Sequence, residues 1–152
     1  MAERVKVGII GAGRIGKLHA ENLCFRVPEI DVVAIADIFE DAAKACAQQC
    51  GIPNYYADPR KIIEDKAIDA VVICSSTDTH SQFIIESAQA GKHIFCEKPI
   101  DFSLERIDKA LAAVDKAGVK LQIGFNRRFD PSMKRVHDLV AAGELGTPHI
   151  LR

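Results

Sequence analysis

Near the start of the chain lies Val5-Lys6-Val7-Gly8-Ile9-Ile10-Gly11-Ala12-Gly13-Arg14-Ile15-Gly16, an apolar run that leads directly into three spaced glycines. The apolar run predicts a buried strand, and the residues from Arg14 to Cys24 predict a helix. Between them, the Gly-x-Gly-x-x-Gly pattern predicts a tight turn at Gly11, room for a pyrophosphate at Gly13 and close packing of the helix on the sheet at Gly16. The amides at the start of that helix favour the same anion. We therefore expect a dinucleotide-binding loop here.

The alternation of strand and helix continues along the whole chain. Further strands are expected at residues 31–36, 54–56, 69–74, 92–96 and 120–124. Further helices are expected at residues 40–50, 59–64, 80–90, 103–117 and 131–142, with Ser103 as an N-cap. This spacing is typical of a doubly wound parallel sheet, the Rossmann type of α/β fold. Residues 147–152 suggest one more strand without a partner, so we predict a dinucleotide-binding domain over 1–146 and the start of a connection to a second, missing domain over 147–152.

Length and composition narrow the class of protein. The chain has 152 residues, of which 48% are hydrophobic, and 20 Lys and Arg stand against 21 Asp and Glu. That content suits one folded domain and excludes a disordered chain. A net charge of -1 argues against a nucleic-acid partner, and no apolar run reaches the length of a membrane span. The start offers no signal-peptide core, so a cytoplasmic location is expected.

The sequence predicts neither a functional cysteine site nor a metal site. The five cysteines are an odd number, and we expect them to pack as free, buried thiols. No cluster of His, Cys and Asp has the spacing of metal ligands, so no metal is predicted.

An acidic residue closes the second expected strand. Asp37 follows Val32-Val33-Ala34-Ile35-Ala36 and stands 26 residues after Gly11. A carboxylate there can accept hydrogen bonds from the adenosine ribose and would repel a 2′-phosphate, which predicts NAD rather than NADP. The alternative is that Asp37 caps the helix that starts near Glu40.

Further candidates follow the fourth, fifth and sixth strands, because open parallel sheets bind ligands at the carboxyl ends of their strands. After the fourth strand, Ser75, Thr77 and His80 are open between a cofactor role and capping, whereas Asp78 and Thr79 are predicted to be caps. After the sixth strand come Arg127 and Arg128. We expect at most one of these two to face the site, with the other paired to Asp130 or Glu144.

After the fifth strand comes Glu97-Lys98-Pro99. Proline keeps Lys98 out of helical conformation and is compatible with a cis peptide bond. A lysine in a cleft beside a nicotinamide can lower the pKa of a substrate hydroxyl and relay its proton. The alternative is a solvated surface lysine, as we expect Lys92 and Lys116 to be.

Several motifs occur together in a characteristic order. They are the glycine loop continued through Lys17-Leu18-His19, then Thr79-His80, Ala90-Gly91-Lys92-His93, Glu97-Lys98-Pro99 and Gly124-Phe125-Asn126-Arg127-Arg128-Phe129-Asp130. The chain resembles the glucose-fructose oxidoreductase/inositol dehydrogenase/rhizopine catabolism family over essentially all its residues. Within this family it is most similar to the inositol 2-dehydrogenases.

The resemblance implies hydride transfer between a polyol or sugar carbon, with myo-inositol at C2 as the best guess, and C4 of NAD. Lys98 matches the active-site lysine of the family. Gly11, Gly13, Gly16 and Asp37 match its cofactor residues, His80 and Glu97 match positions near the nicotinamide, and Arg127 matches a position near the cofactor or the substrate. With these, the predicted cofactor-binding residues also include Ala12, Arg14, Ile15, Ser75, Thr77 and Lys98.

One departure from the family concerns residues that this chain lacks. The family pairs its lysine with an Asp and a His on a helix of a following α/β domain, which also supplies most of the substrate pocket and the oligomer interface. We therefore expect a homo-oligomer only at full length and little turnover by this chain alone. There are two alternatives. One is a stand-alone module that senses a dinucleotide, and the other is a dehydrogenase of scyllo-inositol or of a glucose-type sugar.

Overall fold

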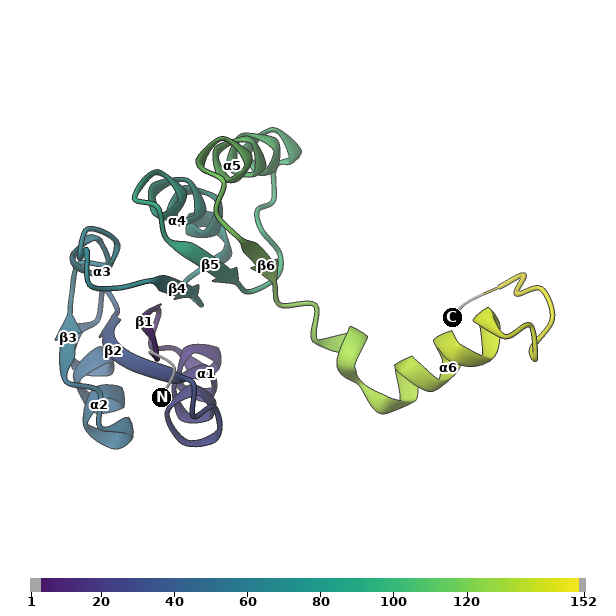
Figure 1. The fold of residues 1–152 in the computed structure, drawn as a ribbon, viewed down its shortest axis with the longest axis horizontal. Coiled ribbons are helices and arrows are strands. Elements are labelled where there is room, and N and C mark those ends of the chain that lie inside the picture. The colour runs from purple at the N-terminus through teal and green to yellow at the C-terminus, as the bar shows by residue number, and fades with distance from the viewer. Residues whose placement is uncertain (1–3, 151–152) are drawn as a thin grey trace.

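Short apolar strands form the centre of the fold. The computed structural model describes residues 4–150, which contain one parallel sheet of six strands in the order β3-β2-β1-β4-β5-β6 (Figure 1). The strands are β1 (Val5–Ile10), β2 (Ile30–Ala36), β3 (Asn54–Tyr56), β4 (Ala70–Ile73), β5 (His93–Cys96) and β6 (Leu121–Ile123). The strand order reverses between β1 and β4, which is the arrangement of a Rossmann fold and confirms the predicted fold class.

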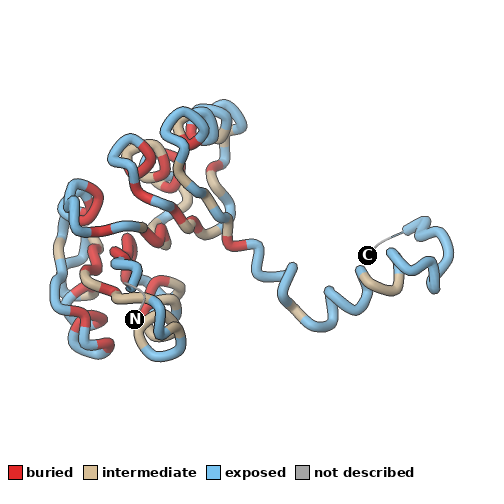
Figure 2. Tube along the Cα trace, viewed as in Figure 1, coloured by how far each residue is buried: buried red, intermediate tan, exposed pale blue. Residues whose placement is uncertain are grey.

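Helices cover both faces of this sheet. They are α1 (Arg14–Arg26), α2 (Glu40–Cys50), α3 (Arg60–Ile63), α4 (Thr77–Gln89) and α5 (Leu104–Ala117). Side chains alternate along β1, so that Val7 and Ile9 join the apolar cluster of α1 and α2, whereas Ile10 joins that of α3, α4 and α5. The buried residues lie along the strands and on the inner sides of these helices (Figure 2). None of the helices described is long and apolar enough to span a membrane.

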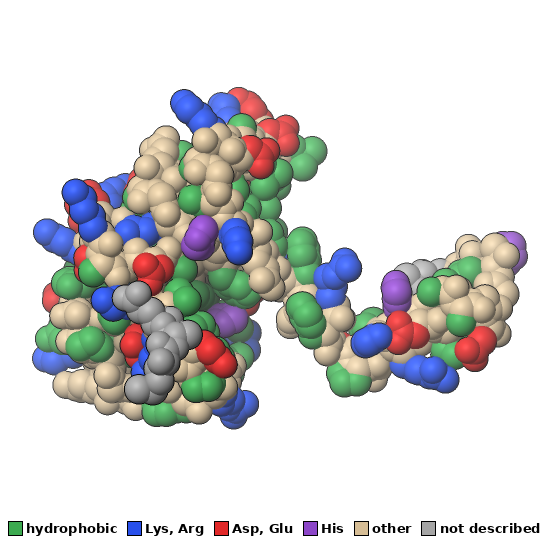
Figure 3. Space-filling view, in the orientation of Figure 1, with side chains coloured by type: hydrophobic (Ala, Val, Ile, Leu, Met, Phe, Trp, Pro, Cys, Tyr) green, Lys and Arg blue, Asp and Glu red, His purple; other side chains and the backbone are tan. Residues whose placement is uncertain are grey.

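The chain leaves the sheet after β6. A 3₁₀ turn, η1 (Asn126–Phe129), and a last helix, α6 (Pro131–Ala141), project away from the strands (Figure 1). On the face drawn in Figure 3, this projecting segment carries basic, acidic and apolar side chains together. Residues 147–150 are irregular and pair with none of the six strands. The strand expected at 147–152 has no predicted partner in this domain, so it stays a prediction. Residues 151–152 lie outside the described part, and the division at residue 146 stays a prediction.

One helix begins earlier than its sequence suggests. The helix α4 starts at Thr77 rather than near His80, because Ser76 has the extended backbone of an N-cap residue. The prediction that Asp78 and Thr79 are caps is therefore wrong, since both lie in the first helical turn. By contrast, the predicted cap at Ser103 is confirmed, because its hydroxyl accepts from the Arg106 N–H at 3.5 Å.

The cysteines are free, as predicted, but not all are fully buried. Cys46, Cys50 and Cys96 are buried, whereas Cys24 and Cys74 are half-buried. Burial, with a smaller contribution from the charge of Glu97, raises the pKa of both Cys74 and Cys96 to about 12. These thiols are therefore protonated at neutral pH, as expected of packing residues.

Lys92 is a buried lysine, which corrects the expectation of a solvated side chain. Only 5% of its surface is exposed, and its Nζ donates to the carbonyl oxygens of Asp65 and Ile68 at 2.6 and 2.7 Å. Burial lowers the pKa of this ammonium group. The two carbonyls compensate for lost water, and they hold the turn before β4 against the start of β5.

We expect Lys92→Met to destabilise the domain by about 1–3 kcal/mol, because it removes the ammonium donor from the buried carbonyl oxygen of Ile68 and leaves the carbonyl of Asp65 with the Ile68 N–H as its donor. Denaturant unfolding would measure this loss. Lys116→Met, on the exposed side of α5, is the control and should change the free energy of unfolding by no more than about 0.5 kcal/mol. Equal stabilities of the two variants would contradict the role of Lys92.

Candidate functional site

The three glycines of the loop after β1 meet three different surroundings. Gly11 has a φ of +104°, and a Cβ there would lie 2.6 Å from the backbone carbonyl of Cys74. A Cβ on Gly16 would overlap the carbonyl oxygen of Gly11, whereas a Cβ on Gly13 would meet no atom within 4 Å. The loop therefore needs glycine at Gly11 and Gly16 in order to fold, while Gly13 keeps open space in front of the backbone.

Neither a capping side chain nor an acidic side chain of the first turn occupies the amides at the start of α1. Its N-cap residue is Gly13, which has no side chain to accept from the first amides, and no acidic residue stands in the first turn. Arg14 and Ile15 begin the helix there, and the first amide with an intrahelical partner is that of Lys17, which donates to Gly13 at 2.9 Å. Unpaired amides at a helix start are suited to a phosphate group.

Asp37 braces this loop from the end of β2. One carboxylate oxygen accepts from the Ala12 N–H at 2.7 Å, and the other accepts from the Phe39 N–H at 2.9 Å. The helix-cap alternative is wrong, because Phe39 is the N-cap of α2. A carboxylate has about four acceptor positions, so two remain for ribose hydroxyls.

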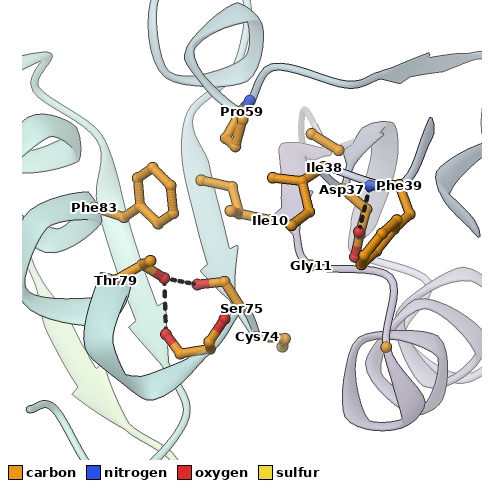
Figure 4. Close-up of a pocket in the computed structure, with 13 residues that line it drawn as sticks. Ile10, Gly11, Asp37, Ile38, Phe39, Pro59, Cys74, Ser75, Thr79 and Phe83 are labelled. Atoms are coloured by element: carbon orange, nitrogen blue, oxygen red, sulfur yellow. Dashed lines mark hydrogen bonds between the residues drawn. The ribbon is translucent and has the colours of Figure 1, made fainter.

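A cavity of 420 Å³ lies between the ends of β1, β2 and β4 (Figure 4). Gly11, Gly13, Asp37 and Ser75 are the predicted residues that line it. Its remaining lining residues are Ile10, Ala36, Ile38, Phe39, Pro59, Cys74, Ser76, Thr79 and Phe83. Most of the additional side chains are apolar, as expected of the wall that receives a flat aromatic base. Phe83 and Pro59 were not anticipated because the fold alone brings α3 and α4 to this edge.

Polar groups on the β4 side of the cavity are bonded to one another. The hydroxyls of Ser75 and Thr79 lie 2.7 Å apart, and Thr79 also donates to the carbonyl of Ser76 (Figure 4). Thr77 is half-buried at the first turn of α4 and does not line the cavity. Of the hydroxyl residues after β4, Ser75, Ser76 and Thr79 therefore line the cavity, and Thr77 does not.

His80 lies inside the protein rather than at the cavity. It is 2% exposed, and its Nδ1 and Nε2 lie 2.7 and 2.9 Å from the carbonyl oxygens of Pro99 and Ser75. Its ring therefore joins the loop after β4 to the loop after β5. In this way it contacts two site loops through their backbone.

Lys98 lies at the mouth of a second cavity. Its side chain is exposed, and the peptide bond to Pro99 is cis. This cavity has a volume of 360 Å³ and is lined by Lys98, Phe125, Asn126, Arg127 and Arg128. The segments after β5 and β6 are therefore brought together, as their positions in a parallel sheet predict.

Both adjacent arginines line the second cavity. The expectation was that at most one of them would face the site, whereas both lie on the short 3₁₀ turn η1 and line this cavity. Arg127 also forms an exposed ion pair with Asp130 at 3.4 Å. The basic groups at this cavity are suited to a polar, oxygen-rich ligand.

Glu97 and His19 form an unexpected pair. The Oε1 atom of Glu97 lies 2.8 Å from Nε2 of His19 on α1. In the sequence, His19 stands out only as part of a motif. Because 78 residues separate it from Glu97, no local pattern predicts this contact.

Comparison with known proteins agrees with this geometry. The oxidoreductase family with an NAD-binding Rossmann fold, which comprises the glucose-fructose oxidoreductase, inositol dehydrogenase and rhizopine catabolism proteins, matches residues 5–125. An uncharacterized oxidoreductase of Bacillus subtilis is 51% identical over 152 residues, and the myo-inositol 2-dehydrogenase of Thermotoga maritima is 44% identical over 148 residues. These matches cover 100% and 97% of this chain but 44% of each relative.

A solved structure has the same fold. The scyllo-inositol dehydrogenase of Lactobacillus casei, with bound NAD(H) and scyllo-inositol, superposes with a TM-score of 0.89 at 32% identity. The match covers 95% of this chain and 43% of that one. The chain thus spans less than half the length of these relatives. Because the family match covers most of the chain and includes the glycine loop, Asp37 and Lys98, this protein belongs to that family of oxidoreductases with an NAD-binding Rossmann fold.

Proposed function

We propose that this chain is the cofactor-binding part of an NAD-dependent dehydrogenase that acts on a polyol or sugar, with myo-inositol oxidised at C2 as the first candidate. The observation that carries the proposal is that the glycine loop, Asp37 and Lys98 lie at one edge of one sheet. The names of the relatives from Thermotoga maritima and Lactobacillus casei support an inositol as the substrate class.

The residues present suit a dinucleotide. The open space before Gly13 and the uncapped start of α1 would hold the pyrophosphate, and Asp37 would hold the adenosine ribose. When bound, the nicotinamide supplies the hydride acceptor for the carbinol carbon.

Lys98 has a separate task in this proposal. Loss of a hydride from a carbinol carbon requires that the hydroxyl proton leave as well. Lys98 stands at the second cavity, where its Nζ would contact the substrate hydroxyl, lower the pKa of that hydroxyl and relay its proton. Arg127 is proposed to contact the cofactor or the substrate at the same cavity.

A fluorescence titration of this 152-residue chain with NADH, repeated with NADPH, tests the cofactor assignment. Saturable binding that prefers NADH supports it, and binding to neither nucleotide contradicts it. A panel of polyols, including myo-inositol, scyllo-inositol and glucose, should then be assayed with the longest natural protein that carries this domain. Turnover of a polyol with formation of NADH is the expected result.

Asp37→Ser should narrow the preference for NADH. In the wild-type chain, repulsion between the Asp37 carboxylate and the 2′-phosphate should make NADPH bind about tenfold or more weakly than NADH, since like charges at one interface cost several kcal/mol. The serine variant lacks this repulsion, so its two dissociation constants should be closer together. Dissociation constants for both nucleotides measure the change. Asp41→Ser, an exposed acid in the first turn of α2, is the matched control and should keep the preference. Equal affinity of the wild-type chain for both nucleotides would contradict the NAD assignment.

A further inference from the structure

The carboxylate of Glu97 is bonded to α1 instead of facing either cavity. Its Oε1 lies 2.8 Å from Nε2 of His19, and the two side chains are only 21% and 24% exposed. We propose that His19 is a positioning residue, which acts through Glu97 to link the helix of the glycine loop to Lys98. The catalytic consequence rests on the proposed function, whereas the link itself does not.

Glu97 is held by its surroundings on several sides. Its N–H donates to the carbonyl of Ile73 on β4 at 2.9 Å. Its carboxylate lies against Gly124 at the end of β6, where a Cβ would come within 3.2 Å of the carboxylate carbon and both oxygens. Glycine at this position therefore leaves room for the carboxylate, and Glu97 contacts the ends of β4 and β6 from the end of β5.

Glu97 also touches the backbone of the residue that it positions. Its Oε2 accepts from the Lys98 N–H at 3.3 Å, while Oε1 contacts His19. Within residues 4–150, His19 is the only side chain that hydrogen-bonds this carboxylate. Loss of the imidazole would therefore free the carboxylate to rotate and remove its contact with Lys98.

His19 is itself fixed relative to the glycine loop. It lies on α1, about one turn after Gly16, and Gly16 packs directly against Gly11. The ring of His19 makes an edge-on contact with Phe95, with centroids 5.1 Å apart and planes at 61°. Phe95 stands two residues before Glu97 on β5. His19 thus touches both the side chain and the strand that lead to Lys98.

The arrangement has a physical consequence for the site. Hydrogen bonds to an ionised carboxylate are stronger than those between neutral groups, and a half-buried carboxylate left alone is costly. The orientation of Glu97 is therefore tied to the position of α1, which begins at the glycine loop.

The test compares His19→Phe, His19→Gln and Glu97→Gln in the longest natural protein that carries this domain. Phenylalanine keeps a ring against Phe95 but has no donor, whereas the glutamine amide keeps a donor near the position of Nε2. Three quantities are measured: the NADH dissociation constant, kcat for the polyol, and the rate at which acetic anhydride acetylates Lys98, followed by mass spectrometry with Lys116 as internal reference. The acetylation rate requires no activity.

We expect His19→Phe to lower kcat by about tenfold or more, because small displacements of a reacting group have effects of up to about 100-fold. The NADH dissociation constant should stay within about twofold, and the acetylation rate of Lys98 should differ from wild type by more than about twofold. In His19→Gln, kcat and the acetylation rate of Lys98 should both stay closer to their wild-type values than in His19→Phe. The double variant His19→Phe/Glu97→Gln should lose no more than the worse single variant, because both changes break one interaction.

Other outcomes separate the two proposals. If kcat and Lys98 acetylation in His19→Phe both stay within about twofold of wild type, the positioning role is overturned. If the losses are additive in the double variant, His19 acts by another route. If the wild-type protein neither binds NADH nor oxidises a polyol, the proposed function fails, and the acetylation rates still decide whether His19 positions Lys98. Should His19→Phe not fold, the comparison of His19→Gln with Glu97→Gln decides it.

Discussion

Lys98→Met is expected to lower kcat for polyol oxidation by about 100-fold or more, because a positioned acid–base group contributes about 10²–10⁴-fold to rate. The assay uses the longest natural protein that carries this domain. NADH should still bind, since the glycine loop and Asp37 lie at the other cavity, away from Lys98. Stopped-flow or steady-state rates together with an NADH titration measure both quantities.

The control for this prediction is Lys44→Met on the exposed side of α2, which should leave kcat unchanged. Methionine keeps the length of the side chain, so a loss of rate would reflect the amine and not a cavity. Unchanged turnover in Lys98→Met would contradict a catalytic role. It would instead favour a domain that senses a dinucleotide, since such a domain has no need for an amine at this cavity.

The order of strands and helices could be predicted from the sequence because each element carries its own signal. The apolar run before Gly11 and the glycines after it indicate a strand, a turn and a helix within 20 residues. The structure then shows that a side chain would clash with backbone atoms at Gly11 and Gly16 but would meet no atom at Gly13. Asp37 also followed from its place at a strand end, although its hydrogen bond to Ala12 did not.

Contacts between distant segments could not be predicted in the same way. Lys92 has the composition of a surface residue, and only the fold brings the carbonyls of Asp65 and Ile68 around its ammonium group. The contacts of His80 with Pro99 and of His19 with Glu97 are similar cases, because both partners lie in the loop after β5.

Gly13→Ala and Gly16→Ala should separate the two reasons for which this loop contains glycine. Gly13 has a φ of −69° and open space around its Cβ position, so alanine should change the free energy of unfolding by no more than about 0.5 kcal/mol. The new methyl group would stand where the pyrophosphate approaches the backbone. Overpacking of this kind costs about 1–3 kcal/mol, which corresponds to about a 5- to 140-fold increase in the NADH dissociation constant.

Gly16→Ala should instead damage the fold and the site together. Its methyl group would overlap the carbonyl oxygen of Gly11, a backbone atom that cannot move without shifting the turn. We expect a loss of stability of about 1–3 kcal/mol or more, accompanied by weaker NADH binding. Denaturant unfolding and NADH titration on the same two variants measure both effects. If Gly13→Ala binds NADH as tightly as wild type, the pyrophosphate does not approach the backbone at Gly13, and the glycine loop serves the turn alone.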